Sequence, residues 1–259
     1  MIVAVSRVLN EDDIAAESAR RMAAQVDHVI IGEGGSVDGT REAIQALVDE
    51  GLPITLQDDP TRNHEQARVM TELAHQAREM GATWVIPYDT DEIWLGRDGR
   101  VADTLANLPP EAMLAPARLI NHICTSADPD EPNPFKRMGW RETQVLPLPK
   151  VACRALPDLS IHDGNHGASY DTRHVLSVTD MLEVRHFPYR SPEQFIKRIE
   201  IAWPQVRDSD KPESYAAHIR AYGQHLEEFG PEGLRRWFKN AMFFEDPENN
   251  PDLIYDPLP

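Results

Sequence analysis

The chain has 259 residues, 41% of them hydrophobic and 27% charged, and its formal net charge is −17. This composition is typical of a globular protein large enough to bury a core. The negative charge repels polyanions, so nucleic-acid binding is disfavoured. We expect neither a signal peptide nor a membrane span of about 18 apolar residues. Two cysteines, Cys124 and Cys153, are too few for a disulfide framework, which favours a cytoplasmic location.

Short apolar runs alternate with helical patterns over the first part of the chain. Strands are predicted at residues 2–5, 28–31, 53–56 and 83–87. Helices are predicted between them, at 12–26, 43–48 and 63–80, because apolar residues recur there at helical spacing. This order predicts a parallel sheet with right-handed crossovers. No G-x-G-x-x-G motif follows the first strand, which argues against a dinucleotide site.

The pattern changes after about residue 110. Further strands are predicted at 112–120, 144–153, 158–162 and 181–187. The segment 126–139 is rich in Pro, Asp and Asn and predicts an exposed loop. Ser191 followed by Pro192 predicts a helix start, with two more helices at 212–228 and 231–239 and an extended acidic tail at 245–259.

Aromatic residues are frequent in the C-terminal segments. Helices that pack on other elements need bulky apolar faces, so these residues favour core packing. An acceptor groove and a dimer contact are the alternatives. The residues concerned are Trp203, Tyr215, Tyr222, Trp237, Phe238, Phe243 and Phe244.

Three acids follow the predicted strand at 83–87 within four residues: Asp89, Asp91 and Glu92, with Thr90 between the first two. Ligands bind at the carboxyl edge of an open α/β sheet, where this strand ends. In an extended segment Asp89 and Asp91 point to the same side, toward one ion or ligand. Carboxylate oxygens suit Mg²⁺ or Mn²⁺. The alternative is a solvated turn after a strand.

A glycine-rich segment, residues 32–40, follows the second predicted strand. Its glycines let the backbone approach a ligand. Asp38 is placed to cap the next helix. An ordinary turn with a cap is the alternative interpretation. In a parallel sheet this segment lies near the acidic motif.

Four segments together resemble family 2 glycosyltransferases: VSRVLNE, IIGEGGSVDGT, WVIPYDTDEIWL and HFPYRSPEQFIKRI. The likeness is good over 1–95 and 181–199 and patchy over 110–180. It implies an α/β fold of the GT-A type, a mixed sheet flanked by helices with a C-terminal helical appendage. The domains would be 1–190, with a nucleotide-sugar half at 1–110 and an acceptor half at 111–190, and an extension at 191–259.

The resemblance further implies a metal-dependent, inverting glycosyltransferase. Its cofactor would be Mn²⁺ or Mg²⁺, its donor a UDP- or GDP-sugar, and its acceptor a glycan or another hydroxyl compound. Asp91 matches the acid that ligates the metal, and Asp89 matches the acid that contacts the metal or the ribose. Glu92 matches a supporting acid, and His186 matches a histidine that completes the metal site.

The nucleotide-binding residues implied by the resemblance include Glu33, which matches the acid that contacts the base or ribose, and Asp38 of the S-x-D-G-T stretch. Glu33 replaces the usual Asp and Gly34 replaces Asp or Asn, so the base is left open. Basic side chains could add charge-assisted hydrogen bonds to the phosphates. The candidates are Arg68, together with Arg7, Arg185 and Arg190.

An inverting transferase needs a base for the acceptor hydroxyl. The segment 160–167 holds two histidines, an aspartate and two glycines, as functional loops often do. Asp163 is our candidate base. His166 is a rival to His186 as a metal ligand, and His162 is either a ligand or a structural hydrogen-bond partner.

Two other functions are compatible with an α/β sheet of this kind. One is a nucleotidyltransferase, against which no Gly-rich, Lys-containing signature follows the first strand. The other is a non-catalytic relative that binds a nucleotide or a sugar.

Overall fold

The computed structural model describes residues 1–61, 65–171, 174–213 and 215–259. The chain divides into two compact units. Unit 1 comprises residues 1–121 and 144–186, and unit 2 comprises residues 122–143 and 187–259. Across the described ranges, no helix is both long enough and apolar enough to cross a membrane. Both cysteines are buried and free of disulfide bonds.

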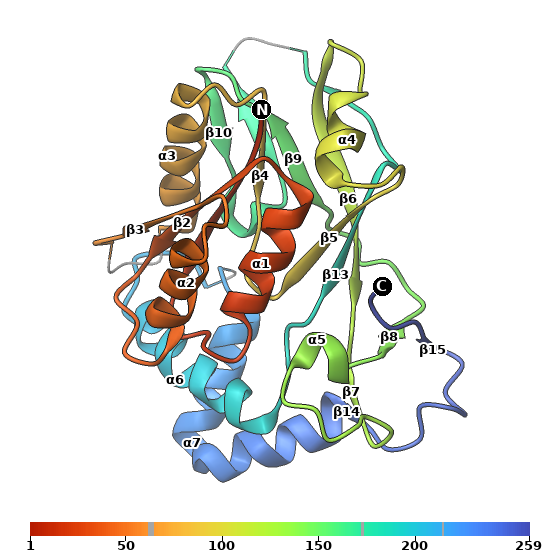
Figure 1. The fold of residues 1–259 in the computed structure, drawn as a ribbon. Coiled ribbons are helices and arrows are strands. Elements are labelled where there is room, and N and C mark those ends of the chain that lie inside the picture. The colour runs from red at the N-terminus through yellow and green to blue at the C-terminus, as the bar shows by residue number, and fades with distance from the viewer. Residues whose placement is uncertain (62–64, 172–173, 214) are drawn as a thin grey trace. The chain divides into compact units, whose positions relative to one another are not determined.

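Unit 1 is built on a mixed sheet (Figure 1). Its described strands run in the order β3-β2-β1-β4-β9-β6-β13-β5, and β12 pairs with β6. Their bounds are β1 Ile2–Val8, β2 His28–Glu33, β3 Ile54–Asp58, β4 Trp84–Pro87, β5 Glu92–Gly96, β6 Ala112–Asn121, β9 Lys150–Arg154, β12 Leu176–Ser177 and β13 Leu182–His186. Strands β1 to β4 are mutually parallel, as predicted. Strand β9 is antiparallel to β4 and β6, and β5 is antiparallel to β13.

Helices flank both faces of this sheet. Helices α1 (Ala15–Gln25) and α2 (Thr40–Asp49) pack on the face that carries Ala4 and Ile31. Helix α3 (Gln66–Glu79) packs on the opposite face, which carries Val5 and Ile30. The alternation of neighbouring residues between the two cores follows from the two-residue period of a strand. The predicted α/β class, a mixed sheet flanked by helices, is confirmed.

The remaining elements of unit 1 complete the two layers. Helix α4 (Val101–Ala106) joins the core of α1 and α2. Strands β10 (Leu159–Ile161) and β11 (Ala168–Tyr170) form a hairpin whose apolar residues join the core of α3. A short 3₁₀ turn, η1 (Asp163–Asn165), lies within this hairpin.

Two predictions for unit 1 differ from the structure. The strand predicted at 144–153 begins only at Lys150, because Pro147 and Pro149 cannot donate ladder hydrogen bonds. Strand β5, which starts at Glu92, was not predicted. The first two residues of the helix predicted at 63–80 lie outside the described residues, and α3 begins at Gln66.

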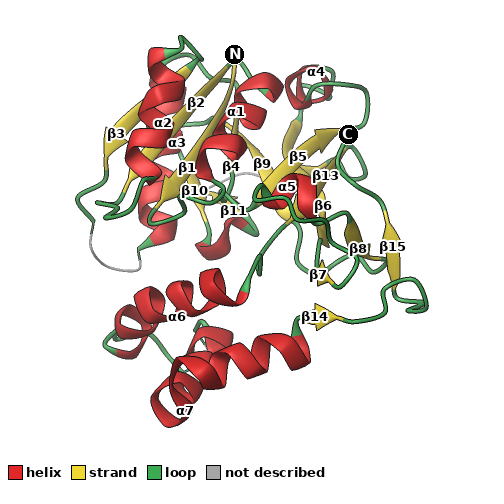
Figure 2. Ribbon diagram, turned by 60° about the horizontal axis from the view of Figure 1, so that its bottom comes forward, coloured by secondary structure: helices red, strands yellow, loops and turns green. Residues whose placement is uncertain are grey.

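Unit 2 combines a helical pair with short strand pairs. Helices α6 (Pro192–Arg207) and α7 (Ala217–Ala241) lie side by side (Figure 2). Strand β7 (Cys124–Thr125) pairs with β14 (Phe243–Phe244), and β8 (Trp140–Glu142) pairs with β15 (Leu253–Tyr255). The tail predicted to be extended therefore contributes a strand.

The start of α6 is as predicted. Ser191 Oγ accepts a hydrogen bond from Gln194 N at 3.1 Å, and Pro192 takes the first helical position. Helix α7 is interrupted at Gly230, where φ is +66°, so the break predicted between 228 and 231 is confirmed. Residue 214, within the helix predicted at 212–228, lies outside the described residues.

The loop predicted to be exposed at 126–139 contains a short helix, α5 (Pro134–Arg137). Asn133 Oδ1 caps it by accepting a hydrogen bond from Phe135 N at 3.0 Å. Phe135 is buried, and its ring meets the edge of Phe187 at 4.9 Å. The prediction that the whole segment is exposed was therefore wrong. The composition of a polar loop does not reveal that an aromatic residue within it is buried.

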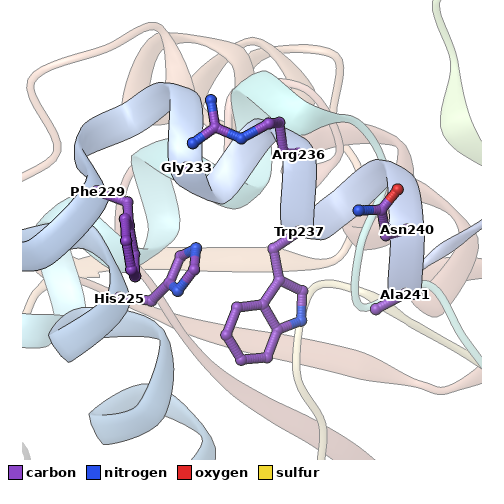
Figure 3. A pocket seen from close by; sticks show the side chains of 7 residues that line it. All are labelled: His225, Phe229, Gly233, Arg236, Trp237, Asn240 and Ala241. Carbon is purple, nitrogen blue, oxygen red and sulfur yellow. The ribbon is translucent and has the colours of Figure 1, made fainter.

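The break in α7 forms a hollow of about 390 Å³ (Figure 3). His225 lies between Phe229 and Trp237, with ring centroids 4.6 and 4.7 Å apart. Elsewhere in unit 2, Trp203 and Phe238 are buried. Core packing is therefore confirmed for Trp203 and Phe238, whereas the other five aromatic residues predicted to pack in the core are only half-buried.

Candidate metal centre

The sheet of unit 1 brings several polar residues to one edge. Strands β4, β6 and β13 run in the same direction, so their carboxyl ends share that edge. Strands β5 and β9 run oppositely, so their first residues lie there too. The edge therefore gathers residues that are far apart in sequence: Asp89 and Asp91 after β4, Asn121 ending β6, His186 ending β13, Glu92 starting β5, and Lys150 starting β9.

The acidic motif forms a turn between β4 and β5. Glu92 N donates to the Asp89 carbonyl oxygen at 3.1 Å, which closes the turn, and Thr90 is buried within it. The expectation of an extended segment, with Asp89 and Asp91 on one side, is therefore wrong. The chain must reverse here because β5 begins immediately after Asp91.

Asp91 and His186 face each other. His186 Nε2 lies 3.6 Å from Asp91 Oδ2. On the other side of the ring, His186 Nδ1 donates to Asn121 Oδ1 at 2.9 Å. An amide oxygen can only accept, so this bond places the proton of a neutral imidazole on Nδ1 and directs the Nε2 lone pair toward Asp91.

This arrangement fits a divalent cation. An imidazole lone pair and a carboxylate oxygen face each other, and both groups are common metal ligands. The side-chain oxygen of Asn121 fixes the tautomer of the imidazole, as hydrogen-bond acceptors do at many metal sites. Ligand atoms of Asp91, Glu92 and His186 all lie within 4.8 Å of one another. Asp91 is buried and His186 is half-buried, so the site is held by the fold.

Both carboxylate oxygens of Glu92 contact other groups of the protein. Its Oε2 accepts hydrogen bonds from Asp89 N at 3.2 Å and from Trp94 Nε1 at 3.3 Å. Its Oε1 forms an ion pair with Lys150 Nζ at 2.6 Å. Burial raises the pKa of Glu92, and the Lys150 ammonium opposes that rise. These contacts hold the Glu92 side chain in place at the start of β5.

Asp89 is also held by neighbouring side chains. Its Oδ1 accepts from Gln66 Nε2 at 3.0 Å and from Asn165 Nδ2 at 3.1 Å. Its Oδ2 pairs with Lys150 Nζ at 2.6 Å. The structure thus separates the two acids of the motif: Asp89 faces Lys150, and Asp91 faces His186.

The loop at 162–167 lies beside this edge. The carbonyl oxygen of Gly164 accepts from Lys150 Nζ at 2.8 Å. His166 Nδ1 bonds to the Pro149 carbonyl oxygen at 2.9 Å, and burial lowers the pKa of His166. His166 is not among the three residues whose ligand atoms cluster. His162 is exposed, and its backbone N donates to Gly167 O at 2.9 Å.

Asp163, the candidate base, is exposed in the same loop. Its Oδ1 accepts from Ala67 N at 3.2 Å, in the first turn of α3. This bond supplies the N-terminal cap that Glu65 does not make. Asp163 thus holds the loop against α3 while its side chain stays accessible to solvent.

The end of β2 places Glu33 and Asp38 in local networks. Glu33 is buried; Oε1 accepts from Ser36 N at 2.6 Å and Oε2 from Arg41 Nη1 at 3.0 Å. Burial would raise the pKa of Glu33, but these hydrogen bonds outweigh it and lower the pKa. Asp38 Oδ1 accepts from Thr40 N at 2.9 Å, but the N-cap residue of α2 is Gly39, so Asp38 lies one residue before the predicted cap position.

A hollow of about 450 Å³ lies at the carboxyl ends of β2 and β3 and against α3. Gly32, Asp59 and Arg68 are among its lining residues. Arg7 Nε pairs with Asp59 Oδ2 at 2.5 Å, and Arg68 pairs with Glu72 at 2.7 Å.

The two other arginine candidates lie elsewhere. Arg185 Nε pairs with Glu183 Oε1 at 2.6 Å, and Arg190 is buried in unit 2, where it donates to the Phe187 carbonyl oxygen.

Four residues at this edge were not predicted: Asn121, Lys150, Gln66 and Asn165. Asn121 directly follows the strand predicted at 112–120, so the carboxyl-edge rule could have found it. Lys150 is a single positively charged residue before an apolar strand, and such a residue indicates a functional site only weakly. Nothing in the sequence distinguishes Gln66 and Asn165 from surface amides.

No family model matches the chain, and no curated protein matches it. Among solved structures, a mannosyltransferase from Pyrobaculum calidifontis in complex with GDP-Man and Mn²⁺ is 17% identical over 90% of this chain and 71% of its own, with a TM-score of 0.43. Glucosyl-3-phosphoglycerate synthase from Mycobacterium tuberculosis is 17% identical over 46% and 43%, with a TM-score of 0.30. A glucose-1-phosphate thymidylyltransferase from Bacillus anthracis is 9% identical over 95% and 86%, with a TM-score of 0.34.

Proposed function

We propose that the protein is a metal-dependent glycosyltransferase of the GT-A type that transfers a sugar from a nucleotide-sugar to an acceptor hydroxyl. The observation that carries this proposal is the pairing of Asp91 with His186 Nε2 at 3.6 Å, with the imidazole oriented by Asn121. Mn²⁺ or Mg²⁺ bound there would supply positive charge to the departing nucleoside diphosphate.

The donor would lie along the carboxyl edge of β3, β2, β1 and β4, within residues 1–110. The hollow at β2 and β3 is two to three strand positions from β4, a distance of roughly 10–14 Å at the usual strand spacing. That separation suits a nucleoside in the hollow with its diphosphate at the metal centre. Arg68 lies at the hollow to contact the donor, and Glu33 and Asp38 hold the loop beside it.

Asp163 would accept the proton of the attacking hydroxyl in an inverting reaction. It is solvent-accessible, and its loop contacts Lys150 through Gly164. Replacement by Asn keeps a cap for α3 while removing a carboxylate that can take a proton. Asp163→Asn should therefore lower kcat at least about 100-fold while leaving Mn²⁺ affinity unchanged.

The donor class is tested by thermal unfolding with UDP, GDP, CDP and dTDP, with and without Mn²⁺. Stabilisation that requires both a nucleoside diphosphate and Mn²⁺ supports the proposal. Asp91→Asn should abolish it, whereas Asp98→Asn, in the exposed turn after β5, should not. Stabilisation by a nucleoside triphosphate with a sugar phosphate would indicate a nucleotidyltransferase instead. No response to any nucleotide with Mn²⁺ would refute the proposed function.

Turnover is tested by incubating the protein with Mn²⁺ and a panel of nucleotide-sugars and measuring nucleotide release. Slow hydrolysis of one donor would identify both the base and the sugar. A protein that binds a nucleotide with Mn²⁺ but releases none from any donor or acceptor would be a non-catalytic relative.

A further inference from the structure

Lys150 is a buried cation at the start of β9. The residue is 4% exposed, and its backbone pairs in register with Ala117 of β6. Burying an ammonium group is costly unless it is paired and hydrogen-bonded. A lysine in this position therefore requires compensating groups, and the structure provides them.

The Lys150 ammonium has three oxygen partners. Nζ lies 2.6 Å from Asp89 Oδ2, 2.6 Å from Glu92 Oε1 and 2.8 Å from the Gly164 carbonyl oxygen. The contacts with Asp89 and Gly164 are hydrogen bonds, and the contact with Glu92 Oε1 is an ion pair. Burial would lower the pKa of Lys150, but the two carboxylates outweigh it and raise the pKa, which keeps the group charged.

The contacts divide three neighbouring carboxylates between two partners. Asp89 and Glu92 contact the ammonium, and Asp91 faces His186 Nε2. Without an internal cation, Asp89 and Glu92 would form an acidic pair in the same turn, with the hard oxygen ligands that a divalent cation prefers.

We propose that Lys150 is a built-in cation that holds Asp89 and Glu92, so that a divalent cation is directed to Asp91 and His186. Lys150 is thus a positioning residue. The proposal rests on the proposed function only in requiring a divalent cation at Asp91. It separates the two acids of the motif by role: Asp91 binds the metal, and Asp89 belongs to the Lys150 network.

The test is Mn²⁺ binding without nucleotide, measured by calorimetry and by electron paramagnetic resonance. Lys150→Met removes one positive charge and exposes two carboxylates to the ion, so Mn²⁺ affinity should rise about tenfold or a second Mn²⁺ should bind. Lys150→Arg keeps the charge and should bind one Mn²⁺ as the wild type does. If Lys150 were only structural, Lys150→Met would loosen the turn and weaken binding.

A second pair of variants keeps the test decisive if Lys150→Met does not fold. Asp89→Asn should change Mn²⁺ affinity less than about threefold, whereas Asp91→Asn should abolish binding. Equal loss in both variants would overturn the role of Lys150 and leave the proposed function standing. If wild-type protein binds no Mn²⁺ with or without nucleotide, the proposed function itself fails, and the role of Lys150 fails with it.

Discussion

The hydrogen bond between Asn121 and His186 allows a quantitative test of the metal centre. Asn121→Ala removes the acceptor that holds the proton on His186 Nδ1 at 2.9 Å. The ring can then carry its proton on either nitrogen and can rotate away from Asp91. Loss of a group that hydrogen-bonds to a metal-binding histidine typically costs 10–100-fold in metal affinity. We therefore expect the Mn²⁺ dissociation constant to rise by about that factor, or about 1.4–2.7 kcal/mol.

The assay is calorimetric titration with Mn²⁺ at one fixed pH for all variants. Asn121→Asp restores an acceptor for Nδ1–H and should recover most of the affinity. Both variants should unfold within a few degrees of the wild type, which separates loss of orientation from loss of folding. If Asn121→Ala binds Mn²⁺ as tightly as the wild type, His186 is not a metal ligand oriented by Asn121.

Two further predictions concern stability. A Cβ added at Gly223 would lie 2.1 Å from the Trp203 ring. Gly223→Ala should therefore destabilise unit 2 by about 1–3 kcal/mol, although Ala has the better helix propensity. Denaturant unfolding measures this change in stability. Glu33→Gln should cost about 2 kcal/mol at pH 7, because Glu33 loses charge-assisted bonds from Ser36 and Arg41. Those bonds lower the pKa of Glu33 below its ordinary value of 4.5. The difference in unfolding free energy between Glu33→Gln and the wild type should therefore be full above pH 4.5 and should shrink as the pH falls through the lowered pKa.

Matched controls are available for both variants. Gln224→Ala changes an exposed neighbour of Gly223 and should alter stability by less than about 0.5 kcal/mol. An unchanged or more stable Gly223→Ala protein would contradict the close packing of α6 on α7. Glu79→Gln, on an exposed site of α3, should show no comparable pH dependence. A Glu33→Gln difference that stays constant down to pH 3 would contradict the lowered pKa.

Much of unit 1 could be predicted because its first half has the simplest sequence pattern. Each buried parallel strand is a short apolar run, and each helix has a regular apolar stripe, so the elements from β1 to β4 were found within a few residues. Strand β5 was missed because it starts with the acidic Glu92, which looked like part of a loop. Its pairing with β13 depends on contacts about 90 residues away, which no local pattern contains.

The candidate site was predicted where chemistry follows a strand and was missed where it depends on pairing between strands. Asp91 and His186 each follow or end an apolar strand, and the structure brings them together. Lys150 reaches the same edge because β9 runs opposite to β4 and β6, which local sequence cannot specify. The prediction that Asp89 and Asp91 point to the same side was wrong for the same reason, because the turn into β5 changes the directions of their side chains.

The strand pairs of unit 2 have a consequence for how the chain folds during synthesis. Residues 124–125 and 140–142 find their partners only at 243–244 and 253–255. More than 100 residues must therefore emerge from the ribosome before either pair can close, while β1 to β4 of unit 1 have their partners much earlier. Until then the inserted segment 122–143 lacks its strand partners. Removing residues 243–259 should leave that segment with two unpaired strand edges, which makes aggregation the expected defect of the truncated chain.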